Sequence, residues 1–157
     1  MSKTIVLIGL SGCGKTTYAK DLSQKLKWPF YDIDEVIAFR EQMSVSDIFK
    51  AKGETYFRAL EWQVFTELIQ LKNIIIATGG GLIPSALSRN ELKPSGVFFL
   101  YLNPSLEMIL IRLQNPNELA RRPLLVNDED LFAKIKKLDQ ERSKAYLSWA
   151  DAIITNC

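Results

Sequence analysis

The sequence contains no histidine among its 157 residues. Without imidazole, a chain has neither the commonest general base nor the Ser-His and Cys-His nucleophile pairs. Histidine-ligated metal sites are excluded for the same reason. Any catalysis must therefore depend on carboxylates, lysine, arginine, backbone dipoles and a hard metal ion.

Cysteines and long apolar runs are also scarce. Cys13 and Cys157 lie at opposite ends of the chain and form no CxxC motif, which argues against a disulfide framework or a zinc site. No apolar run approaches the ~20 residues of a membrane span. The N-terminus lacks the small-residue cleavage pattern of a signal peptide. We expect a cytoplasmic protein with reduced thiols and no membrane partner.

Charge of one sign does not accumulate either. The net charge is +2, and basic residues are interspersed with acidic ones, so nucleic-acid binding receives little support. A chain of this length forms one domain that buries roughly 70% of the surface exposed on unfolding. We therefore expect a single domain over 1–157, acting as a monomer.

Five short apolar runs alternate with stretches of helical spacing. Most of the runs lack polar alternation, which is typical of strands buried on both faces. We predict an α/β fold with a five-stranded parallel sheet flanked by helices on both faces. The expected strands are 4–9, 29–33, 73–78, 97–102 and 152–155, and the expected helices are 15–27, 35–42, 44–72 with a break near Gly53, 104–114 and 127–149. The segment 115–126, with its two prolines and paired arginines, is expected to form a long mobile loop.

The strongest motif is GLSGCGKT at 9–16, which fits G-x-x-x-x-G-K-[ST] between an apolar strand and a helix. Its glycines let backbone N–H groups turn toward phosphate oxygens, while lysine and threonine serve the β/γ phosphates and Mg²⁺. The alternative is a glycine-rich turn that only joins strand to helix. The expected ATP-binding residues here are Ser11, Gly12, Cys13, Gly14, Lys15, Thr16 and Thr17.

Cys13 has two interpretations. At the start of a helix its thiolate would be favoured electrostatically, which would make it reactive. Alternatively, it is a small space-filling residue without reactivity.

A phosphate loop alone does not separate switches, motors and transferases. No N-K-x-D segment for guanine recognition is present, so a small-molecule kinase is favoured. Asp32 and Asp34 alternate across the end of the expected second strand and would point to different sides. One would hold metal-bound water and the other would face an acceptor. The alternative is that one aspartate, Asp34 in particular, caps the following helix.

Three consecutive glycines, 79–81, follow the expected strand 73–78. Glycines in a row let backbone N–H groups converge closely on a small anion. The alternative is a tight strand-to-helix turn, which needs fewer glycines.

Six motifs occur in an order that resembles the shikimate kinase family, from Lys3 to about Thr155. The motifs are GLSGCGKT, DID, FRALE (57–61), GGG, RRPLL (121–125) and ERSKAY (141–146). The resemblance implies a kinase of the nucleoside-monophosphate kinase type, with a mobile lid at about 115–126 and a substrate-binding helical segment at about 34–62. It implies transfer of the γ-phosphoryl group of ATP to the 3-hydroxyl of shikimate, with Mg²⁺, in aromatic amino-acid biosynthesis.

The resemblance also implies residue roles. The implied catalytic residues are Lys15, Asp34 and Arg122, of which Arg122 also contacts ATP from the lid. The implied metal-binding residues are Thr16 and, through water, Asp32. The implied substrate-binding residues are Asp34, Phe49, Phe57, Arg58, Gly80 and Arg142, with Arg58, Gly80 and Arg142 on the substrate carboxylate.

From spacing alone, several of these residues have simpler interpretations. Phe49 and Phe57 fit a helix core, and Arg142 fits a solvated helix surface. Arg58 and Glu61 lie three apart on a predicted helix, so they would form an ion pair in which Glu61 orients Arg58.

The family usually continues past the last strand with an adenine-contacting loop and a terminal helix, and we expect that helix to be absent here. Arg112 is then the candidate to pack on the adenine base. Two other functions are kept. One is a related kinase acting on gluconate or another hydroxy acid, and the other is a nucleotide-binding regulatory module without catalysis.

Overall fold

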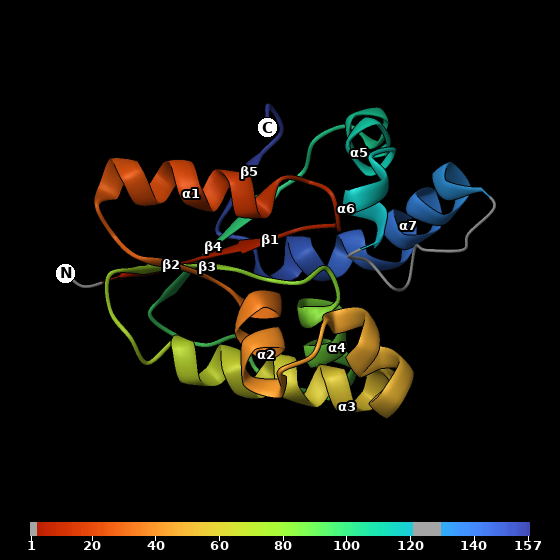
Figure 1. The fold of residues 1–157 in the computed structure, drawn as a ribbon. Helices are drawn as coiled ribbons and strands as arrows, with labels where there is room; N and C mark the ends of the chain where they lie inside the picture. The colour runs from red at the N-terminus through yellow and green to blue at the C-terminus, as the bar shows by residue number, and fades with distance from the viewer. Residues whose placement is uncertain (1–2, 121–129) are drawn as a thin grey trace.

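In the part of the chain that the computed structural model describes, residues 3–120 and 130–157, five parallel strands form one sheet (Figure 1). The strands are β1 (Thr4–Ile8), β2 (Phe30–Asp32), β3 (Ile74–Ala77), β4 (Val97–Leu102) and β5 (Ala152–Ile154). Their order in the sheet is β2-β3-β1-β4-β5. The predicted parallel sheet is confirmed, and each strand lies inside its expected range.

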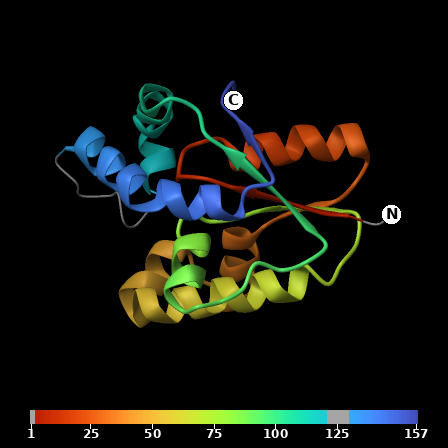
Figure 2. The ribbon, with the colours of Figure 1, turned by 180° about the vertical axis from the view of Figure 1, so that it is seen from behind.

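Helices cover both faces of this sheet, as predicted. Figures 1 and 2 show α1 and α5 on one side and α2, α3 and α4 on the other, while α7 contacts α4, α5 and β4. The bounds are α1 (Lys15–Leu26), α2 (Ile33–Glu41), α3 (Val45–Leu68), α4 (Leu82–Ser88), α5 (Leu106–Leu113), α6 (Pro116–Ala120) and α7 (Leu131–Trp149). None of the helices described is both long and apolar enough to cross a membrane.

The core lies along the neighbouring strands β1 and β3. Every residue of β3 is buried, and in β1 only Ile5 is partly exposed, as expected for strands covered on both faces. An aromatic chain then joins the sheet to two helices. Phe99 of β4 packs against Phe65 of α3 and against Trp149 of α7, at centroid distances of 6.3 and 5.3 Å.

The expected loop at 115–126 is wrong for its first part, because Pro116–Ala120 forms helix α6. Proline at the first position of a helix already has a helical φ and its missing N–H is not needed there. Asn115 Oδ1 accepts a hydrogen bond from the Asn117 amide at 3.0 Å, which supports the start of this helix. Residues 121–129, and with them Arg122, lie outside the described residues.

The predicted break in the long helix is confirmed at Gly53, whose φ of 84° and ψ of 171° are not helical. A residue with a side chain would be strained in this conformation, so glycine permits the bend. The two parts of α3 therefore run in different directions. Helix α4 was not among the expected helices, because only seven residues separate the glycine run from its end and Pro84 lies within it.

Candidate active site

The phosphate loop joins β1 to α1, as the motif predicts. Gly9, Gly12 and Gly14 have φ values of 145°, 82° and 95°, which favour glycine. The Lys15 side chain is only 8% exposed, and its ammonium donates to the carbonyl oxygens of Gly9 at 2.7 Å and Leu10 at 2.8 Å. A turn that merely connected strand to helix would not require a buried ammonium at its centre. This geometry supports the phosphate-binding interpretation.

Cys13 is fully buried beneath this loop. Its Sγ atom lies 3.5 Å from Lys15 Nζ, and a Cβ atom on Gly9 would lie 2.9 Å from it. Of the two interpretations of Cys13, the burial favours the space-filling residue.

The two residues expected at the metal are brought together. The Thr16 hydroxyl donates to Asp32 Oδ2 at 2.7 Å. The other Asp32 oxygen accepts from the backbone amides of Asp34 at 2.9 Å and Glu35 at 3.4 Å, which caps α2. The capping aspartate is therefore Asp32, and the alternative that Asp34 caps the helix is wrong. Asp34 lies in the first turn of α2 and not on strand β2, so the two aspartates do not alternate along a strand as expected.

Asp34 has an unusual carboxyl group. Its Oδ1 atom is buried, and among the described residues no group donates a hydrogen bond to it. Burial, followed by the negative charges of Glu61 and Asp32, raises the pKa of Asp34 to about 7, although Lys15 and Arg58 act in the opposite direction. A carboxyl group with a pKa near neutrality is suited to accept a proton.

The ion pair expected between Arg58 and Glu61 is confirmed. Arg58 Nη1 donates to Glu61 Oε2 at 2.7 Å, and Glu61 is only 1% exposed. The Arg58 guanidinium also lies 5.9 and 5.6 Å from the ring centroids of Phe49 and Phe57, which are 4.8 Å apart. Phe57 is buried in the core as its spacing suggested, whereas Phe49 is partly exposed.

Close approach, not unusual backbone angles, explains the glycine run at 79–81. None of the three glycines has a positive φ. A Cβ atom on Gly79 would lie 2.5 Å from Glu61 Oε1 and 3.3 Å from Asp34 Oδ1. Two carboxyl groups thus occupy the space that a side chain at this position would need.

The other two glycines meet different groups. A Cβ atom on Gly80 would lie 3.1 Å from the Ser11 amide nitrogen and 3.4 Å from Arg142 Nη1. A Cβ atom on Gly81 would lie 2.5 Å from both terminal nitrogens of Arg58. Residues 79–81 are therefore the point where the phosphate loop and the two expected carboxylate-binding arginines meet.

Tyr146, for which the motifs predicted no role, fixes helix α7 to residues 79–81. The Tyr146 hydroxyl donates to the Gly80 carbonyl at 2.5 Å, and its ring packs against Tyr101 at a centroid distance of 5.2 Å. Burial raises the pKa of Tyr146, which keeps the hydroxyl protonated as a donor. The R-x-x-x-Y spacing places Arg142 and Tyr146 on one helix face, and this spacing could have identified Tyr146 as a residue near the site.

A cleft of about 1150 Å³ lies beside the phosphate loop. It is lined by the phosphate loop, by Asp32 and Asp34, by 78–80 and by Arg112. A Cβ atom on Gly14 would lie 3.2 Å from Arg112 Nη1, which has no hydrogen-bond partner among the described residues. Arg112 is thus near the nucleotide loop, and its contact with adenine stays a prediction.

A phosphate loop and a buried carboxyl group in one cleft, with two arginines beside the glycine run that borders it, are typical of a P-loop kinase of small molecules. The sequence model described as "Shikimate kinase" matches residues 11–156. The chain is 39% identical to the shikimate kinase of Sulfurihydrogenibium sp. (strain YO3AOP1), over 92% of this chain and 82% of that protein. It is 40% identical to the shikimate kinase of Aquifex aeolicus (strain VF5), over 90% of this chain and 80% of that protein. The chain belongs to the shikimate kinase family.

Solved structures agree with this assignment. Shikimate kinase from Acinetobacter baumannii in complex with shikimate superimposes with a TM-score of 0.88 at 33% identity, covering 98% of this chain and 83% of that one. Deoxyadenosine kinase from M. mycoides with bound dATP, at 14% identity and a TM-score of 0.59, covers 97% and 90% and shares the fold. The prediction of a kinase of the nucleoside-monophosphate kinase type is confirmed.

Proposed function

We propose that the protein transfers the γ-phosphoryl group of ATP to the 3-hydroxyl of shikimate. The observation that carries this proposal is the convergence on residues 79–81. The phosphate loop approaches Gly80 through Ser11, while Arg58 and the carboxyl group of Asp34 approach Gly81 and Gly79. Groups suited to the phosphate donor and to an acidic, hydroxylated acceptor therefore meet at one place.

The nucleotide side rests on the phosphate loop. Lys15 binds the β/γ phosphates, and the backbone amides of 11–17 surround the phosphate oxygens at the start of α1. Thr16 and Asp32 fit Mg²⁺, because a hydroxyl and a carboxylate 2.7 Å apart leave most positions to water and phosphate oxygens, as this ion prefers. When bound, Mg²⁺ neutralises charge on the transferring oxygens.

The acceptor side rests on α2, α3 and α7. Arg58 and Arg142, with the Gly80 amide, hold the carboxylate, because charge-assisted hydrogen bonds give both affinity and orientation. Phe49 and Phe57 contact the apolar face of the ring. Asp34 accepts the proton of the reacting hydroxyl, and Glu61 keeps Arg58 in place.

Arg122 is proposed to stabilise the charge of the transferring group when the lid at 115–126 closes and excludes water. This part of the proposal depends on the family motif RRPLL, since Arg122 lies outside the described residues. We also propose that the enzyme is a cytoplasmic monomer.

The test is acceptor-dependent formation of ADP. Purified protein should form ADP from ATP only when both Mg²⁺ and shikimate are present, and EDTA should abolish the reaction. Gluconate and related hydroxy acids serve as competing acceptors. ADP formation that proceeds equally without shikimate, or faster with gluconate, would refute the proposed acceptor. Nucleotide binding without any turnover would favour the regulatory module.

A further inference from the structure

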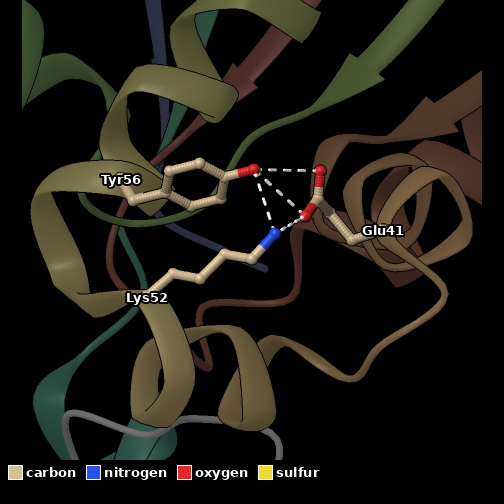
Figure 3. Close-up of polar contacts among 3 residues, drawn as sticks. All are labelled: Glu41, Lys52 and Tyr56. Atoms are coloured by element: carbon tan, nitrogen blue, oxygen red, sulfur yellow. Dashed lines mark hydrogen bonds and ion pairs between the residues drawn. The ribbon is translucent and has the colours of Figure 1, made fainter.

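Three side chains between α2 and α3 form a hydrogen-bonded cluster, which we call the α2–α3 clasp: Glu41, Lys52 and Tyr56 (Figure 3). Lys52 Nζ donates to Glu41 Oε2 at 2.8 Å, and the Tyr56 hydroxyl donates to the same oxygen at 3.1 Å. Lys52 Nζ also lies 3.3 Å from the Tyr56 hydroxyl and 4.7 Å from its ring centroid. Each member therefore contacts both of the others.

The clasp spans the bend of α3. Lys52 directly precedes Gly53, where the helix breaks, and Tyr56 lies three residues after it. The same bend brings Phe49, from the first part of the helix, to within 4.8 Å of Phe57 in the second. The angle of the bend therefore sets how the two rings lie around Arg58.

The clasp also joins this bend to the helix that carries Asp34. Glu41 is the last residue of α2, and Asp34 lies in the first turn of the same helix. The hydrogen bond from Lys52 holds the pKa of Glu41 below its usual value, and that bond raises the pKa of Lys52. Both groups thus stay charged near neutral pH.

A role in stability alone does not account for this arrangement. The Lys52 side chain is 41% exposed and that of Glu41 is 17% exposed, and exposed ion pairs add little to folding stability. A separate ion pair, between Arg40 and Glu67 at 2.6 Å, already joins α2 to the second part of α3. Of these two links between α2 and α3, the clasp is the one that contacts both sides of the bend.

We propose that Glu41, Lys52 and Tyr56 are positioning residues that fix the bend of α3, and through it the place of Phe49 and Arg58 around the acceptor. This inference rests on the proposed function, because the acceptor is taken to be shikimate. None of the clasp's three residues lines the cleft. The clasp acts by favouring one conformation of the bend. A ligand binds more weakly when the binding-competent conformation of the protein is only partly populated.

The test compares Lys52→Met with Arg40→Met. Each variant removes one cation from an α2–α3 ion pair and keeps an unbranched side chain, but only Lys52 borders the bend. For Lys52→Met we expect the KM and the calorimetric Kd for shikimate to rise about twofold to fivefold, the scale of a partly exposed ion pair. Its kcat and its KM for ATP should stay within about twofold of the wild type, and Arg40→Met should match the wild type throughout.

Rescue separates positioning from a general loss of structure. The exchanged variant, Glu41→Lys with Lys52→Glu, restores opposite charges and should recover shikimate affinity, whereas Glu41→Lys alone should not. Thermal unfolding of every variant is measured in parallel. Wild-type shikimate affinity in Lys52→Met, an equal change in Arg40→Met, or parallel losses of shikimate and ATP binding would each overturn the inference. A wild-type protein that neither binds nor phosphorylates shikimate would instead overturn the proposed function itself.

Discussion

Replacing Gly81 with alanine would place a methyl group against the Arg58 guanidinium. The new Cβ atom would lie 2.5 Å from both terminal nitrogens, whereas non-bonded heavy atoms prefer about 3.5 Å. The guanidinium must therefore retreat by roughly 1 Å. The backbone angles of Gly81, φ −94° and ψ −3°, are accessible to alanine, so the substitution displaces the arginine without straining the chain.

The expected change in shikimate affinity follows from the hydrogen bond between Arg58 and the proposed substrate carboxylate, which this retreat removes. A hydrogen bond to a charged group contributes about 1.5–3 kcal/mol. The Kd for shikimate should therefore rise roughly 10-fold to 150-fold. Gly81 is the N-cap of α4, where alanine is poorer than glycine by roughly 1 kcal/mol, so the melting temperature should fall by about 2–4 °C.

Calorimetric titrations with shikimate and with an ATP analogue, run on Gly81→Ala and Gly80→Ala, measure these effects. In Gly80→Ala the new Cβ atom meets the Ser11 amide at 3.1 Å, so this variant should lose affinity for both substrates. Gly81→Ala should lose affinity for shikimate alone. Unchanged shikimate affinity in Gly81→Ala, or equal losses for ATP, would show that Arg58 does not hold the acceptor.

Further predictions concern Asp34 and Cys13. Asp34→Asn removes the proton acceptor, so kcat should fall roughly 100-fold or more while ATP affinity holds; a kcat near wild type would leave Asp34 outside the chemistry. Because the pKa of Asp34 is raised to about 7 in the folded protein, the folded state binds more protons than the unfolded chain between about pH 4 and 7, and stability should fall as pH rises through that range. Urea unfolding without divalent cations should therefore find Asp34→Asn more stable than wild type at pH 8, by up to about 4 kcal/mol, with the difference vanishing below pH 4. Since Cys13 is fully buried, iodoacetamide should label Cys157 in the native protein and Cys13 only after denaturation, as read by peptide mass spectrometry; fast native labelling of Cys13 would contradict its burial.

The sheet was predictable because its strands are short, apolar and separated by helical spacing. The first residues of the helices were harder to predict. The sequence predicts the helix after β2 from residue 35, but it begins at Ile33. The later expected start made Asp34 the alternative candidate for the cap, although Asp32 supplies it. Aspartate is favoured both at N-caps and in the first helical turn, and sequence alone does not separate the two positions.

The motifs contain several residues that the structure brings together around 79–81, but the motifs did not predict their contacts. The glycine run predicted that other groups approach the backbone closely, but it did not predict which side chains these are. Glu61 and Arg58 come from a helix some 20 residues earlier, and only the packing of α3 against the sheet places their charged ends beside Gly79 and Gly81. The clasp had no signal at all, because Lys52 and Tyr56 show ordinary helical spacing and Glu41 belongs to another helix.

The order of the strands separates the placement of the phosphate donor from the recognition of the acceptor. Strands β1 and β3 are neighbours, with Leu7 opposite Ala77, and Thr78 donates two hydrogen bonds to the Leu7 carbonyl. β1 leads into the phosphate loop and β3 into 79–81, so the two segments proposed to bind donor and acceptor follow strands that lie about 4.8 Å apart. The proposed acceptor groups, in contrast, come mainly from α2, α3 and α7, which are packed onto the sheet from outside. Selection on this scaffold can therefore exchange the acceptor by rebuilding those helices, while the path of the phosphoryl group stays constant.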